Sequence, residues 1–133
     1  MNDPVKPAPT KMIAIYACSG CSDAGELADR TARVLSQQKR GDMSCLAGIG
    51  GRVKSLMMKA EKADHIVAID GCPLNCARHT LEQAGFQTLH HLELHKLGLR
   101  KGSCPLTEER LAVAVQAGAE LIQTIEKGGK ANL

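Results

Sequence analysis

The chain of 133 residues carries a net charge of +3 and is 44% hydrophobic and 23% charged, which suits one globular domain with a substantial core. It has no Trp, one Tyr and one Phe, which excludes an aromatic platform for single-stranded nucleic acid, and the small charge argues against any nucleic-acid partner. No apolar run reaches about 18 residues, which excludes a membrane-spanning helix and argues against a membrane partner.

Residues 1–10 are polar and contain three of the five prolines. We interpret them as a flexible leader, because they lack the apolar stretch of a signal peptide. Residues 11–133 are predicted to form a single domain in the cytoplasm. Structural disulfides are rare in that reducing compartment, so the six cysteines indicate metal binding or thiol redox chemistry.

The first predicted element is a strand over residues 11–17, whose apolar sequence suits burial on both faces. It ends at the sequence Cys18-Ser-Gly-Cys21. Asp23 is expected to cap the next helix, with Glu26 completing a capping box, and this helix should end near Gln38.

Residues 42–46 are expected to form a very short second strand, and a glycine-rich turn follows over residues 48–51. Apolar residues at helical spacing mark the next helix: Val53, Leu56, Met57 and Ala60. Residues 65–69 form the clearest strand in the chain. Pro73 is then placed in the first turn of a helix that ends at Gly85.

Residues 87–94 are the fourth predicted strand, and a glycine-containing loop follows it. Thr107 is expected to cap the last helix, which ends before Gly128-Gly129. Strands that alternate with helices favour right-handed crossovers. The sequence therefore predicts a three-layer, Rossmann-like α/β fold, with a mainly parallel sheet of about four strands and helices on both faces.

Each predicted strand ends at, or is followed by, one or two cysteines: Cys18 and Cys21, Cys45, Cys72 and Cys76, and Cys104. The carboxyl ends of parallel strands share one edge, which is where open α/β sheets bind their ligands. Cysteines that act only as small hydrophobes would lie inside strands and on apolar helix faces. Most of these lie in turns instead, which favours a shared thiol site at that edge.

The spacing of the cysteines adds to this prediction. The sequence Cys18-x-x-Cys21 lets two sulfurs bind one ion or each other. The sequence Cys72-x-x-x-Cys76 is expected to place its second thiol about one turn inside a helix, on the same side as the helix start. A sulfur near a helix N-terminus is favoured as the thiolate, and zinc takes four thiolate or imidazole ligands in a tetrahedron.

Three segments resemble the DGC-domain family, to which zinc binding is ascribed: Tyr16–Ser22, Met43–Cys45 and Ile69–Ala77, which contains the Asp-Gly-Cys motif itself. The resemblance covers roughly residues 12–126. It implies four chelating cysteines, here Cys18, Cys45, Cys72 and Cys76, and no established reaction. Cys21 lies outside that set and is kept as a further candidate ligand.

Two other kinds of thiol site remain open. The first is a dithiol oxidoreductase, because a Cys-x-x-Cys sequence follows the first strand and enters a helix. The second is an iron–sulfur cluster, which four cysteines also serve. The sequence decides neither whether the chain is an enzyme nor its oligomeric state.

The cysteines outside the family set have their own expected role. Cys21 lies beside a helix start and Cys104 follows Arg100-Lys101, so both are expected to face the cleft and to favour the thiolate. At least one is predicted to be a reactive thiol that hands a metal or an electron pair to a partner protein. The plain alternative for Cys104 is an ordinary loop residue.

Asp70 and a glycine-rich segment carry weaker signals. Asp70 follows a strand, where an acceptor for turn N–H groups is favoured over a proton shuttle beside Cys72. Residues 48–52 open a helix and could hold an anion with the help of Arg52, but a plain turn is the favoured interpretation.

The histidines do not form an evident metal cluster. His90 and His91 are adjacent in a strand and should point to opposite faces. His95 is near enough to the strand end to approach the cysteine edge. Each of the five is interpreted as a structural or surface residue: His65, His79, His90, His91 and His95.

Overall fold

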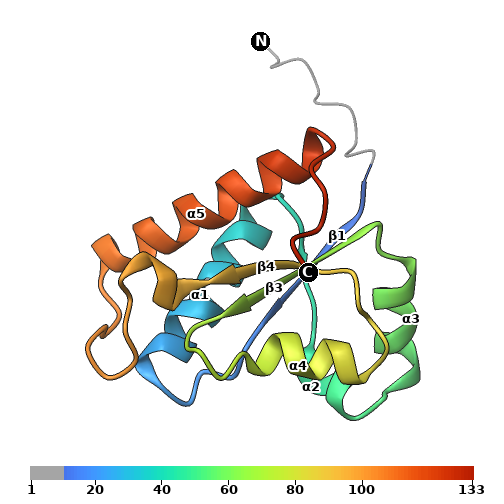
Figure 1. Ribbon diagram of the computed structural model, residues 1–133, viewed down its shortest axis with the longest axis horizontal. Coiled ribbons are helices and arrows are strands. Elements are labelled where there is room, and N and C mark those ends of the chain that lie inside the picture. The colour runs from blue at the N-terminus through green and yellow to red at the C-terminus, as the bar shows by residue number, and fades with distance from the viewer. Residues whose placement is uncertain (1–10) are drawn as a thin grey trace.

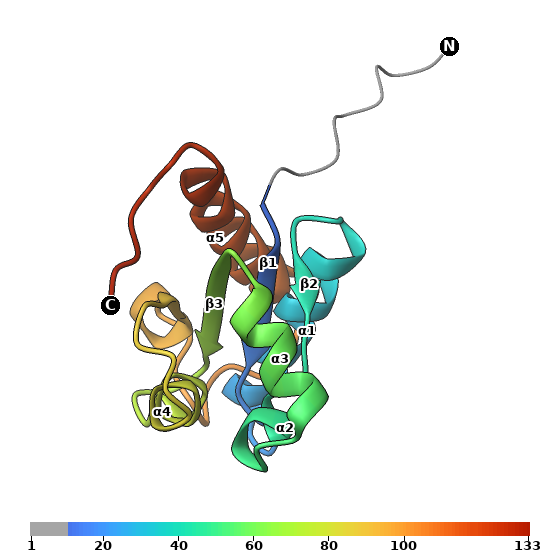
Figure 2. The ribbon, with the colours of Figure 1, turned by 90° about the vertical axis from the view of Figure 1, so that its right-hand side faces the viewer.

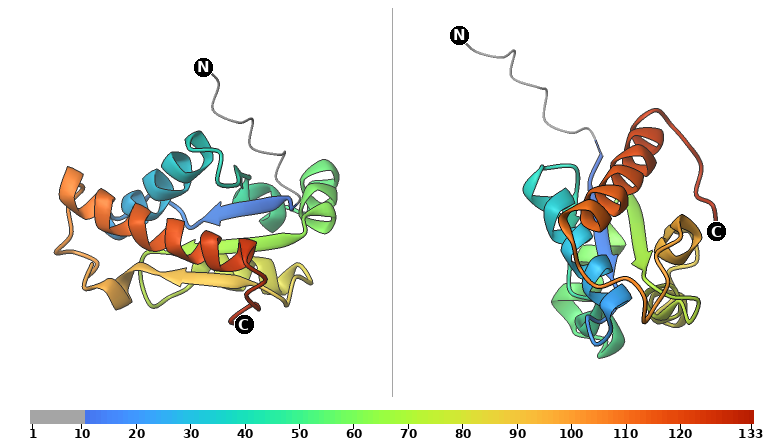
Figure 3. Two further views of the ribbon diagram at one scale, coloured as in Figure 1. Left: turned by 90° about the horizontal axis from the view of Figure 1, so that it is seen from above. Right: turned by 90° about the vertical axis from the view of Figure 1, so that its left-hand side faces the viewer.

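The computed structural model describes residues 11–133, so the leader predicted over residues 1–10 lies outside the described part. Four strands form one all-parallel sheet in the order β2-β1-β3-β4; Figure 1 labels β1, β3 and β4, and Figure 2 labels β2 beside β1. They are β1 (Ile13–Ala17), β2 (Asp42–Met43), β3 (His65–Asp70) and β4 (His90–Glu93). The arrows of β1, β3 and β4 point the same way in the view from above (Figure 3, left).

Helices cover both faces of this sheet, which confirms the predicted three-layer α/β fold (Figure 2). On one face lie α1 (Asp23–Gln37) and α5 (Glu108–Glu126), which pack against each other. On the other lie α2 (Leu46–Gly50), α3 (Lys54–Lys62) and α4 (Cys76–Gln83). A 3-10 turn, η1 (Leu94–Leu97), follows β4. Within residues 11–133, no helix is both long and apolar enough to cross a membrane.

The core is divided into two halves by the sheet. Alternate residues of a strand point to opposite faces, so the continuous apolar run of β1 serves both halves. Ile13 and Ile15 join the core beneath α1 and α5, while Ala14 and Tyr16 join the core beneath α2, α3 and α4. This double burial is the reason that β1 and β3 are almost wholly apolar.

The start of α1 differs from the prediction. Ser22, and not Asp23, is the cap: its Oγ accepts a hydrogen bond from the Gly25 N–H at 3.0 Å. The Asp23 carboxylate instead accepts the backbone N–H groups of Gly102 and Cys104, at 2.8 and 3.1 Å. Asp23, which was predicted to act only as the cap of its own helix, therefore ties the loop before α5 to the start of α1.

Two further boundaries were predicted wrongly. The turn expected over residues 48–51 is mostly helix α2, which Cys45 caps. Gly48 has no side chain, which allows Leu56 of α3 to pack against it. Pro73 is not in the first turn of α4, which begins at Cys76 after Asn75 adopts a left-handed conformation at φ 53°. The cap of α5 is as predicted, since Thr107 Oγ1 accepts the Arg110 N–H at 3.1 Å.

The chain end covers the outer strand β4. Asn132 pairs with the backbone of His91 in both directions, accepting from its N–H at 2.7 Å and donating to its carbonyl at 3.1 Å. The N–H of Leu133 also donates to the carbonyl of Leu89. The unpaired N–H and carbonyl groups of an edge strand can pair with another chain. Here the side chain of Asn132 pairs with both backbone groups of His91.

Gly71 yields the first prediction. A Cβ at this position would overlap the backbone carbonyl of Ala24, which cannot move aside as a flexible side chain could. We expect Gly71→Ala to lower the free energy of unfolding by about 3 kcal/mol in a denaturant titration, through overpacking between β3 and α1. Gly50→Ala is the matched control, because its added methyl group meets only an ordinary contact with Thr80. Equal stability of the two variants would contradict the close approach.

Candidate functional site

The carboxyl ends of β1 and β3 bring a thiol and a backbone donor together. The N–H of Cys18 donates to the carbonyl of Ile69 at 3.1 Å, which extends the pairing of the two strands by one residue. The N–H of Gly71 then donates to Cys18 Sγ at 3.4 Å. Cys18 is half-buried, and its sulfur is oriented by the first residues after β3.

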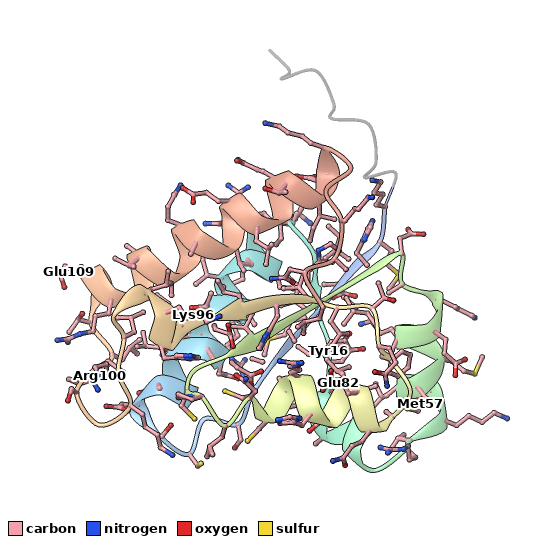
Figure 4. The ribbon with its side chains drawn as sticks, viewed as in Figure 1. Tyr16, Met57, Glu82, Lys96, Arg100 and Glu109 are labelled. Atoms are coloured by element: carbon pink, nitrogen blue, oxygen red, sulfur yellow. The ribbon has the colours of Figure 1, made fainter. Side chains whose placement is uncertain are left out.

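The surroundings of Cys18 oppose the loss of its proton. Its pKa is raised from 9.0 to about 11, and the largest cause is burial. The hydrogen bond from the Gly71 N–H lowers the pKa, whereas negative charge on Asp70, Cys72 and Cys76 raises it. Three cysteines from two adjacent strand ends therefore share one electrostatic environment. Figure 4 shows sulfur atoms, in yellow, near the starts of α1 and α4.

The remaining cysteines of the predicted ligand set lie in exposed turns. Cys45 is the N-terminal cap of α2, and its Sγ accepts the Gly48 N–H at 3.3 Å. Cys21 precedes the cap of α1. Cys76 is exposed and is the first residue of α4, so the expectation that it lies a full turn inside the helix is wrong.

Cys104 does not face the cleft, where it was expected. It is 1% exposed and belongs to the core beneath α1 and α5. Burial raises its pKa and Asp23 acts in the same direction, against a smaller opposing effect of Arg110. Its backbone lies in the loop while its side chain packs in the core. That Cys21 or Cys104 is a reactive thiol stays a prediction, and the exposed Cys21 is the more accessible of the two.

All six cysteines fall within the described residues and carry free thiols. Within residues 11–133, no three His, Cys, Asp or Glu side chains are already arranged to hold a metal ion. The cysteines at the carboxyl edge of the sheet are therefore not arranged as a complete metal site. The predicted set of metal ligands stays a prediction.

Asp70 organises the site without being one of its thiols. Its side chain is 1% exposed, and its two oxygens accept the N–H groups of Ala77 and Arg78 at 2.8 and 3.1 Å. Asn75, at the cap position of α4, makes no capping bond with its own side chain. The carboxylate of Asp70 therefore caps α4 from the end of β3, which confirms its predicted role as a backbone acceptor.

A histidine holds this carboxylate from the other side. His91 Nε2 lies 2.8 Å from Asp70 Oδ2, and both side chains are buried. His91 Nδ1 lies 3.7 Å from Glu93 Oε1, and Glu93 also pairs with Lys96, which is labelled in Figure 4. Partial burial alone would raise the pKa of Glu93, but Lys96 and His91 outweigh it and hold that pKa low.

The pairing between His91 and Asp70 could not be predicted from the sequence, because it depends on the register of β3 and β4. The other histidines lie apart from the thiols in their described contacts. His79 on α4 is exposed beside Glu82, and the buried Nδ1 of His95 has no hydrogen-bond partner. His90 and His91 contact different partners, as expected for adjacent residues in a strand.

The anion site considered for residues 48–52 is not supported. The Arg52 guanidinium donates to three backbone carbonyls, at 2.8 Å to Ile49, 3.3 Å to Gly50 and 2.9 Å to Gln83. The Nη1 and Nη2 groups of Arg52 therefore link the end of α2 to the end of α4 through hydrogen bonds to backbone carbonyls.

The parallel sheet and the Asp-Gly-Cys sequence at the end of β3 define a protein class. The DGC domain model matches residues 14–118, so the chain belongs to the DGC-domain family, as its resemblance implied. Its relatives include the anaerobic and virulence modulator AnvM of Pseudomonas aeruginosa. That protein is 38% identical over 120 residues, which cover 87% of each chain. No solved structure matches the chain at a significant level.

The network around Asp70 yields the second prediction. In Asp70→Asn, an amide NH₂ group replaces one of the two acceptor oxygens, so at least one buried donor loses its partner. We expect a loss of about 3 kcal/mol in the free energy of unfolding, together with faster hydrogen exchange at the Ala77 and Arg78 amides. Asp29→Asn, which removes an exposed pair with Arg33, is the control and should leave both nearly unchanged. Unaltered exchange at Ala77 and Arg78 would show that Asp70 is not the cap.

Proposed function

We propose that the chain is a cytoplasmic protein that binds one zinc ion through Cys18, Cys72 and Cys76, with Cys45 or Cys21 as the fourth ligand. The observation that carries the proposal is the convergence of β1 and β3, where the Gly71 N–H donates to Cys18 Sγ beside the Asp-Gly-Cys turn. Thiolates are the ligands that structural zinc sites use most.

The electrostatics of the edge support a cation there. Asp70, Cys72 and Cys76 all oppose ionisation of Cys18, and the same negative potential attracts a divalent ion. When zinc binds, each ligating thiol releases its proton, so binding is coupled to deprotonation. The thiols must also rotate toward one another, because no three ligands are in place within residues 11–133.

Asp70 acts here as a positioning residue. Its oxygens are occupied by the amides of Ala77 and Arg78 and by His91, so they are not free to coordinate an ion. By fixing the start of α4 against the end of β3, Asp70 sets the separation of Cys72 and Cys76. Support of this kind from outside the ligand set is common at metal sites.

The state of Cys18 argues against a dithiol oxidoreductase. Such enzymes attack with a thiol whose pKa is lowered by a helix start or a positive charge. Cys18 is half-buried with its pKa raised to about 11, and α1 starts only at Asp23, after the cap residue Ser22. An iron–sulfur cluster needs the same thiols and is distinguished by experiment.

The name of the relative, an anaerobic and virulence modulator, fits a regulatory protein better than a metabolic enzyme. We extend this to the present chain: the exposed Cys45 and Cys76 offer a route by which a partner protein exchanges the metal. The partner would present thiols of its own, since transfer of zinc between thiolates requires ligands of matching softness.

Elemental analysis after anaerobic purification tests the proposal. We expect about one zinc per wild-type chain, and a loss of affinity of at least about 100-fold in Cys72→Ala, because a tetrahedral site loses one ligand. Cys104→Ala is the matched control, since that thiol lies in the core, and it should retain the metal. Unchanged zinc binding by Cys72→Ala would refute the ligand assignment. A brown protein with iron and sulfide would assign the thiols to a cluster instead.

Alkylation followed by peptide mapping gives a fourth prediction. Zinc should protect Cys18, Cys72 and Cys76 and slow their oxidation in air, whereas the metal-free protein should form at least one disulfide. Cys104 should resist labelling in both states because it is buried. Protection of either Cys45 or Cys21 identifies the fourth ligand. Equal labelling with and without zinc would mean that the cysteines share no ion.

A further inference from the structure

Two histidines meet at the end of the sheet opposite to the thiols. His65 begins β3 and His90 begins β4. In the register of these strands, Val67 lies opposite His90, so the two histidines are offset by two residues and face the same side. His65 Nδ1 lies 3.1 Å from His90 Nε2, and the rings meet edge to face with centroids 5.1 Å apart.

The pair lines an open hollow of about 410 Å³. Polar side chains share its wall with the two imidazoles: Glu61, Asp64, Gln87 and Thr88. His90 is 3% exposed, and burial followed by the nearby charge of His65 lowers its pKa. The neutral imidazole is the form in which histidine binds metals.

The separation of the two nitrogens fits a chelated ion. Two ligands that each lie about 2.1 Å from a metal ion, at an angle between octahedral and tetrahedral, are roughly 3.0–3.4 Å apart. The observed nitrogens fall within that range. Without a metal, a single N–H of one ring bridges the two nitrogens. With a metal, that proton moves to the other nitrogen of the same ring, and the rings turn so that the two lone pairs, which face each other in the hydrogen bond, meet at the ion.

We propose that His65 and His90 form a second metal site, a bis-imidazole site for a divalent transition-metal ion. Imidazole suits zinc, nickel and copper ions. No third protein ligand is in place within residues 11–133, so water from the hollow completes the coordination and the ion stays exchangeable. The site shares no residue with the thiols and stands whether or not those bind zinc.

Paramagnetic broadening by Ni²⁺ tests this site in the full chain, after one equivalent of zinc has been added for the thiols, so that no excess zinc competes for the imidazoles. At the lowest Ni²⁺ additions, the ring resonances of His65 and His90 should broaden together, ahead of those of His79 and His95. His65→Gln and His90→Gln should each weaken the binding by at least about 10-fold. His79→Gln is the control and should bind as the wild type does, because His79 lies on the exposed surface of α4.

The outcome separates this site from the thiol site. In Cys72→Ala, broadening at His65 and His90 should persist even if the thiols no longer bind zinc. The proposal is overturned if the rings of His65 and His90 broaden no earlier than the others. This measurement on the wild-type protein does not depend on the folding of any variant. Unchanged Ni²⁺ binding in both glutamine variants would overturn it equally.

Discussion

The buried carboxylate of Asp70 joins three elements of the fold: the end of β3, the start of α4 and, through His91, strand β4. A buried charge is costly unless it is fully hydrogen-bonded. Here two amides and an imidazole compensate it, and the positive end of the α4 dipole adds to the compensation. The carboxylate of Asp70 therefore holds the two ends of the turn that carries the candidate ligands Cys72 and Cys76.

The architecture was accessible from the sequence because it rests on local patterns. Buried runs such as residues 65–69, followed by helical spacing, require a parallel sheet, and the strand ends then bring Cys18 and Cys72 close. What the sequence did not reveal depends on tertiary contact. The cap of α1 is Ser22, while the carboxylate of Asp23 also accepts N–H groups from a loop some 80 residues later. Cys104 is buried because that loop folds inward.

The two ends of the sheet offer ligands of different softness. Thiols gather where β1 and β3 end, whereas imidazoles meet where β3 and β4 begin. Both proposed sites require the register of β3 with its neighbours, since a shift of one residue would turn Asp70 and His65 toward the opposite face. The pairing of Asp70 with His91 supports that register, because it ties the end of β3 to β4.

The central claim is that the carboxyl edge of the sheet holds a metal with cysteine ligands. X-ray absorption at the zinc edge, recorded on the His65→Gln/His90→Gln variant loaded with one equivalent of zinc, tests it most directly. The account predicts a shell of three to four sulfur atoms at about 2.3 Å. A shell made mainly of nitrogen and oxygen would contradict it.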